Sequence, residues 1–120
     1  MVAQDSNAEL IVFPGMDKEN VLDLDDWELN RTANAVKAMA HPLRLKLLCL
    51  IGTCEISVQE LTNRVHQTSQ SNISQHLAHM LERGVLENRK QGNQVLYRIR
   101  DPRILSLIIA MRSVFCPHTH

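Results

Sequence analysis

The sequence predicts a mainly α-helical domain that carries one β-hairpin. Apolar residues recur at helical spacing in five segments, and capping residues, proline or glycine mark most of their ends. Between the fourth and fifth segments, two strand-like runs at 85–89 and Gln94–Ile99 flank a turn-rich stretch at 90–93. The expected order is therefore four helices, two strands that form a hairpin, and a final helix.

A chain of 120 residues is expected to form one domain. We expect an acidic, flexible N-terminal arm at 1–22, a folded domain at 23–116 and a short tail at 117–120. The sequence lacks the pattern of a signal peptide and any apolar run long enough to cross a bilayer, which predicts a cytoplasmic protein with no membrane partner. Aromatic residues make up only 3%, so the core is expected to be aliphatic.

The first two helices are predicted from their ends. Asp25 and Glu28 have the spacing of a capping box, which opens a helix that runs to about residue 40. Pro42 suits the first turn of a second helix over 43–51, and Gly52 ends it. Apolar residues nearly surround this second helix, so it should lie at the centre of the domain.

The third and fourth helices are separated by only a tight turn. Ser57 and Glu60 again have capping-box spacing and open a short helix to about residue 65. The turn at 66–68 leads into a helix that starts near Ser69 and ends at Gly84. Two helices joined in this way form a helix-turn-helix.

The fourth helix carries an unusual surface of short, uncharged, hydrogen-bonding side chains. Ile73 and Leu77 share its inner face, while hydroxyl and amide groups occupy the others. Such groups can meet base edges and phosphates in the major groove of DNA, and the basic hairpin that follows is placed to act as a wing. Plainer interpretations are also available: the fourth helix can start with Ser and Gln for structural reasons alone, and the hairpin is then a solvated basic turn. The candidate DNA-binding residues are Thr68, Ser69, Gln70, Ser71, Asn72, Ser74, Gln75, His76, Arg89, Lys90 and Asn93.

Charge is unevenly distributed although the net charge is zero. Residues 1–28 hold eight acidic residues and one lysine, whereas residues 62–100 hold six basic and two acidic residues. The basic stretch coincides with the helix-turn-helix and the hairpin, which favours a nucleic-acid partner for that part of the chain.

The last helix is apolar on more than one face. Asp101 and Pro102 open it, and a domain this small has little surface to cover it. We therefore expect a homodimer in which the first and last helices pack against their mates. Its two fourth helices would meet the two halves of an inverted repeat in operator DNA.

Four blocks of sequence together resemble the ArsR/SmtB family of bacterial repressors. They are AMAHPLRL at 38–45, SVQEL at 57–61, QSNISQHL at 70–77 and GVL at 84–86, and the likeness covers about residues 28–116. The resemblance implies a dimeric winged helix-turn-helix protein that occupies an operator until an inducer weakens binding.

The metal sites of that family can be compared position by position. Where arsenic- and cadmium-responsive members carry a Cys-x-Cys pair, this chain has Ser57 and Gln59. Where zinc-responsive members carry an Asp and a His at the start of the last helix, this chain keeps Asp101 but has Arg103. The resemblance therefore implies that both common metal sites are lost, and no cofactor is expected.

The cysteines point to a different sensor. Three cysteines are an odd number and do not form a structural disulfide framework. Cys49 in the second helix and Cys116 at the end of the last resemble the dithiol branch of the family. Its members respond to oxidants or reactive sulfur species by joining two thiols through a disulfide or a bridge of several sulfurs.

Other readings of the thiols remain open at this point. Cys49 can be a small core residue and Cys116 an inert tail residue, and Cys54 can compete as a partner. Cys116, His118 and His120 have a spacing that can bind Zn²⁺, which would make a zinc-type repressor. A small thiol enzyme is the least favoured reading, so the protein is not expected to be an enzyme.

Overall fold

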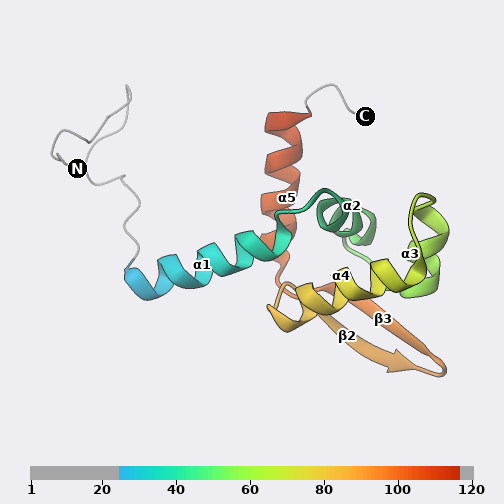
Figure 1. The fold of residues 1–120 in the computed structure, drawn as a ribbon. Coiled ribbons are helices and arrows are strands. Elements are labelled where there is room, and N and C mark those ends of the chain that lie inside the picture. Colours follow the sequence, from blue (N-terminus) through green and yellow to red (C-terminus); the bar gives the residue numbers. More distant parts are fainter. Residues whose placement is uncertain (1–24, 117–120) are drawn as a thin grey trace, which may run out of the picture.

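Five helices and three short strands make up residues 25–116, the part of the chain that the computed structural model describes (Figure 1). The predicted arm at 1–22 and tail at 117–120 lie outside the described residues. The elements in chain order are α1 (Asp26–Met39), α2 (Pro42–Ile51), β1 (Ile56–Ser57), α3 (Val58–Arg64), α4 (Gln70–Glu82), β2 (Leu86–Gln91), β3 (Gln94–Ile99) and α5 (Pro102–Phe115). All five predicted helices are confirmed.

Polar residues cap the helix starts, and one predicted capping box is complete. The Asp25 carboxylate accepts from the N–H of Glu28 at 2.8 Å, and the Glu28 carboxylate accepts from the N–H of Asp25 at 3.1 Å. Of the second predicted capping box, only the hydrogen bond to the serine is formed, and the prediction of the bond to the glutamate is wrong. Ser57 Oγ accepts from the N–H of Glu60, but the Glu60 carboxylate pairs instead with Arg64 one turn later at 3.0 Å.

The turn between α1 and α2 is closed by a histidine. His41 Nδ1 accepts a hydrogen bond from the N–H of Leu43 at 3.0 Å, and Pro42 fills the first turn of α2. Gly52 follows α2 with a φ of +54°, a conformation that glycine adopts without strain. Leu47, Leu48 and Ile51 are fully buried, which confirms the central position of α2.

The sheet has three strands in the order β1-β3-β2, so the prediction of two strands is incomplete. The short β1 pairs antiparallel with β3, with Ile56 opposite Tyr97. Two residues are too few to show the alternation by which a strand is recognised in a sequence. The extra strand ties the middle of the hairpin to the loop that follows α2.

The hairpin turn is tighter than predicted. β2 and β3 remain paired as far as Gln91 and Gln94, which leaves Gly92 and Asn93 as the turn in place of the stretch 90–93. Gly92 has a φ of +62°, as two-residue hairpin turns commonly require. The wing is therefore longer and more regular than the sequence indicates.

The core is aliphatic, as predicted, and lies between α2, α3, α4 and the sheet. Its largest fully buried side chains are Leu47, Leu48, Ile51, Leu61, Val65, Ile73, Leu77, Met80, Val85 and Leu86. Burying one such side chain contributes roughly 1.5–3 kcal/mol, so α4 is held firmly by its three inner residues. Among residues 25–116, no helix has both the length and the apolar character needed to span a membrane.

Two helices leave large apolar side chains uncovered. Figure 1 shows α1 extending away from the other helices and α5 standing beside α2. Trp27 on α1 is 66% exposed, and Ile109 and Phe115 on α5 are 59% and 78% exposed. Leu29 and Val36 on α1 are exposed as well.

Candidate nucleic-acid interface and thiol sites

The outer face of α4 is free of charge for three turns. Ile73, Leu77 and Met80 point into the core and fix which side of the helix faces outward. Ser74 is partly buried at the edge of the outer face. The exposed side chains of that face are Gln70, Ser71, Gln75 and Ala78. The structure therefore presents two amides and a hydroxyl side by side, a set that can donate to and accept from base edges.

Three of the predicted DNA-binding residues are engaged in holding the start of α4. Ser69 Oγ accepts from the N–H of Asn72 at 3.1 Å, and Asn72 Nδ2 donates to Thr68 Oγ1 at 2.8 Å. Thr68 and Asn72 are partly buried. These side chains set where α4 begins, so the candidates left with free hydrogen-bonding groups are the residues exposed beyond them.

His76 also faces inward. Arg44 Nε donates to His76 Nδ1 at 3.1 Å, and the ring centroids of His41 and His76 lie 4.5 Å apart. Burial lowers the pKa of His76, and the charges of His41, Arg44 and His79 lower it further. The neutral ring is thus a structural hydrogen-bond partner between α2 and α4.

On the wing, the two predicted basic residues differ. Arg89 forms a two-pronged ion pair with Glu55 at 2.7 and 2.8 Å and also donates to Gln91 at 3.1 Å. The hydrogen bond from Arg89 is the main cause that lowers the pKa of Glu55. Lys90 is exposed beside the turn and Asn93 is exposed within it. Arg89 therefore braces the wing against the loop before β1, while Lys90 carries the charge at its tip.

Other basic residues of the stretch at 62–100 also form ion pairs. Arg64 pairs with Glu60, and Arg98 pairs with Glu87 across the hairpin. Within the described part of the chain, the bases of residues 62–100 that form no ion pair are Arg83, Lys90 and Arg100. Ion pairs with nearby acids therefore offset half of the six basic residues counted at 62–100.

The two candidate sensor thiols are both exposed. Cys49 lies on α2 and Cys116 is the residue that ends α5, and these two helices pack against each other. The reading of Cys49 as a core residue is wrong, because Leu47 and Leu48 take the buried positions while Cys49 points outward. Reagents in solution can reach both sulfurs.

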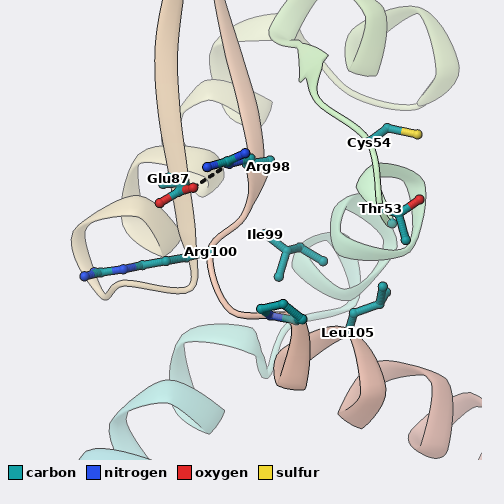
Figure 2. Close-up of a pocket in the computed structure, with 9 residues that line it drawn as sticks. Thr53, Cys54, Glu87, Arg98, Ile99, Arg100 and Leu105 are labelled. Carbon is teal, nitrogen blue, oxygen red and sulfur yellow. Dashed lines mark hydrogen bonds and ion pairs between the residues drawn. The ribbon is translucent and has the colours of Figure 1, made fainter.

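Cys54 is exposed as well, so it is as open to reagents in solution as the two candidate sensor thiols. It borders a shallow pocket of about 350 Å³ next to Ile99 and Leu105. Figure 2 shows the Cys54 side chain directed away from these two apolar residues, and the ion pair of Glu87 and Arg98 on the opposite side of the pocket. Cys54 thus lines the pocket with its sulfur turned away from the apolar side.

At the start of α5, Arg103 forms hydrogen bonds and an ion pair with the carboxylate of Asp101. The guanidinium of Arg103 donates to both carboxylate oxygens, with a shortest contact of 2.6 Å, and the Asp101 carboxylate also accepts from the N–H of Arg103. These bonds hold the pKa of Asp101 down to about 2. Among the described residues, no group of three or more His, Cys, Asp or Glu side chains is placed to hold a metal ion. His118 and His120 lie outside the described residues.

Two residues of the interface were not predicted from the sequence. Glu55 is a single acid before a two-residue strand, and only the three-dimensional pairing brings it to Arg89. Arg44 lies within the block HPLRL that carries the family resemblance, and that block was the one signal that could have drawn attention to it.

No protein-family model matches the chain. The HTH-type transcriptional regulator YgaV of Escherichia coli K12 is 36% identical over 88 residues, which cover 72% of this chain and 88% of that protein. The biofilm growth-associated repressor of Xylella fastidiosa Temecula1 is 32% identical over 103 residues, which cover 86% of each.

The structure of HlyU from Vibrio cholerae superposes with a TM-score of 0.70 at 32% identity and covers 77% of this chain and 99% of that chain. A structure of reduced HlyU from the same organism gives a TM-score of 0.67 at 34% identity, over 78% and 99%. HlyU of Vibrio cholerae is named a transcriptional activator, whereas the Xylella fastidiosa protein is named a repressor. These relatives therefore include both activators and repressors of transcription.

Proposed function

Because the chain belongs to the ArsR/SmtB family of winged helix-turn-helix transcriptional regulators, we propose that it is a cytoplasmic DNA-binding repressor. One observation carries the proposal. The outward face of α4, with Gln70, Ser71 and Gln75, is uncharged and hydrogen-bonding, and a two-stranded wing stands beside it. The role is regulation of transcription and not catalysis.

The repressor works as a homodimer on an inverted repeat. The exposed apolar side chains of α1 and α5 provide the surface that a second copy would cover, and burial of such a patch drives association. A two-fold axis between the copies would set their two α4 helices about one turn of DNA apart.

Its inducer is an oxidant or a reactive sulfur species that acts on Cys49 and Cys116. Both thiols are exposed, and they lie on two helices that pack against each other. α2 also contacts α4, so a bond that pulls on α2 would reach the DNA-reading helix. The similar HlyU has been solved in a form described as reduced, which fits a protein whose redox state matters.

The chemistry balances with a persulfide as the oxidant. One cysteine thiolate attacks the outer sulfur of glutathione persulfide and becomes a protein persulfide, which releases glutathione thiol. The second thiolate then attacks the inner sulfur, Sγ, of the first cysteine, which forms the disulfide between the two cysteines and releases the outer sulfur as hydrogen sulfide. If both cysteines become persulfides, their condensation forms a trisulfide and also releases hydrogen sulfide. Peroxide takes the two electrons directly and forms a disulfide and water.

The test uses the full-length protein and a duplex selected on it from a random DNA library. Cys49→Ser and Cys116→Ser should each bind this duplex like the parent and keep hold of it after treatment with glutathione persulfide. Cys54→Ser is the matched control and should release it. If Cys49→Ser still releases DNA like the parent, the dithiol proposal is wrong.

Mass spectrometry of the intact protein separates the inducers. Sulfur inserted between Cys49 and Cys116 after persulfide treatment identifies a reactive-sulfur sensor. Loss of two hydrogens with both persulfide and peroxide identifies a general oxidant sensor. Release of DNA by Zn²⁺ from the fully reduced protein would instead favour the zinc reading of Cys116, His118 and His120.

A further inference from the structure

One guanidinium joins three helices at the inner side of α4. Arg44 lies on α2, and its Nε donates to His76 Nδ1 on α4 at 3.1 Å. Its Nη1 donates to the carbonyl of Ala38 near the end of α1 at 3.2 Å. Because α1 carries the exposed apolar face and α4 carries the polar one, this link connects the two working surfaces of the molecule.

The link requires a neutral histidine. His76 accepts through Nδ1, so in the neutral ring the proton resides on Nε2. The neighbouring His41 ring, 4.5 Å away between centroids, also accepts through Nδ1, from the N–H of Leu43 at the start of α2. A proton on either Nδ1 would remove the hydrogen-bond acceptor. Its N–H would then point at the N–H of Arg44 or of Leu43, and two donors would face each other.

The surroundings keep His76 in the neutral form near neutral pH. Its pKa is lowered from 6.5, first by burial and then by the charges of His41 just before α2, of Arg44 on α2 and of His79 on α4 itself. Among the described residues, no charge of α1, α3 or β2 contributes to this shift, although these elements also pack against α4. Since the folded pKa lies below the ordinary value, the stabilisation from neutral His76 is present above pH 6.5 and is lost as the pH falls through the folded pKa.

We propose that His76 is a positioning residue for DNA binding, whose neutral ring, held by Arg44, fixes α4 against α1 and α2 and whose protonation releases it. The inference rests on the proposed function, because it assumes that α4 reads DNA. Operator affinity should therefore fall in mild acid, while the thiols stay reduced. Loss of one such hydrogen bond predicts an affinity about two- to tenfold lower.

The direct test measures binding of the reduced full-length protein to the selected duplex from pH 8 to pH 5.5 at constant ionic strength. Affinity is expected to fall with a midpoint below pH 6.5. His76→Asn keeps an acceptor close to the position of Nδ1 but cannot titrate, so it should bind at pH 8 and lose most of the decline. His66→Asn, which alters an exposed histidine in the turn before α4, is the matched control and should keep the decline.

Two results would overturn the inference. A flat profile in the parent shows that protonation of His76 does not control affinity. A rise in affinity toward acid that His76→Asn removes shows that the imidazolium contacts phosphate instead. Absence of binding to any duplex at pH 8 would count against the proposed function and not against this link.

The link can also be tested without DNA. The N–H signal of the Arg44 side chain in an NMR spectrum should be protected from exchange at pH 8 and should lose that protection as the His76 ring titrates. In the Cys54→Ser variant the same behaviour is expected. An Arg44 signal that is unprotected at pH 8, or that stays protected through the titration, contradicts the inference.

Discussion

The outer face of α4 and the outer faces of α1 and α5 are both exposed, but they differ in every other respect. The face of α4 presents amides and a hydroxyl, and Thr68 and Asn72 hold its start by a hydrogen bond. The faces of α1 and α5 present Trp27, Ile109 and Phe115, with most of each side chain open to solvent.

The difference shows what each surface needs from its partner. Water satisfies the hydrogen bonds of an exposed amide until a matching base edge replaces it. The polar face of α4 is therefore stable in solution without a bound partner. An exposed Phe or Ile face is costly in water, so the α1 and α5 faces call for a permanent partner. This contrast supports the proposal of a permanent homodimer that binds and releases DNA.

The largest effect is expected from a charge on the apolar face. Ile109→Glu should raise the dissociation constant of the homodimer on the order of a hundredfold, because association would bury an unpaired carboxylate. Analytical ultracentrifugation measures the constant directly. Binding to an inverted-repeat duplex should fall with it, because two linked half-sites would no longer be engaged together.

Thr53→Glu provides the control for Ile109→Glu. It adds the same charge to the exposed loop after α2 and should leave the dimer unchanged. If Ile109→Glu sediments like the parent, the dimer does not use this face of α5.

The next effect concerns the polar face. Gln75→Ala should weaken binding to the selected duplex about tenfold and relax selectivity at one base pair of each half-site, because an amide that reads a base edge is lost. Electrophoretic mobility shifts with a set of single-base variants measure both quantities. Asn34→Ala removes an exposed amide from α1 and should alter neither; an equal loss in both variants would mean that Gln75 does not read bases.

The wing should show a smaller effect that depends on salt. Lys90→Ala should weaken binding uniformly across sequences and reduce the slope of log affinity against log salt by about 1.8, because the homodimer loses one phosphate contact, worth about 0.9, on each of its two wings. Arg89→Ala should change this slope less, because its guanidinium is already paired with Glu55. Fluorescence anisotropy over a range of salt concentrations compares the two, and equal slopes would show that Arg89 leaves Glu55 to bind DNA.

The sequence identified the helices because each carries its own local signals. Asp25, Ser69 and Asp101 each cap a helix in the structure, and Gly52 and Gly92 have the positive φ that their positions require. The inner face of α4 could be assigned for a similar reason, since Ile73 and Leu77 are one turn apart. Order, helix ends and the face of α4 are all set over a few residues.

The contacts between distant residues could not be predicted in this way. The pairing of Ile56 with Tyr97 and of Glu55 with Arg89 joins residues that no sequence spacing relates. The exposure of Cys49 also escaped prediction, because a thiol between two leucines looks like part of the core until α2 is placed against its neighbours. The same placement decides which candidate residues are exposed on the outer face of α4 and which hold the start of that helix.

The smallest effect separates support from reading at the start of α4. Thr68→Val keeps the shape of the side chain but removes the acceptor for Asn72 Nδ2, which should lower the free energy of unfolding by about 1 kcal/mol. Urea unfolding measures this change. Base selectivity should stay as in the parent, because Thr68 and Asn72 are partly buried and do not belong to the exposed face that carries Gln70, Ser71 and Gln75. A change of selectivity without loss of stability would move Thr68 from the residues that hold α4 to those that read DNA, and would extend the polar face into the turn before the helix.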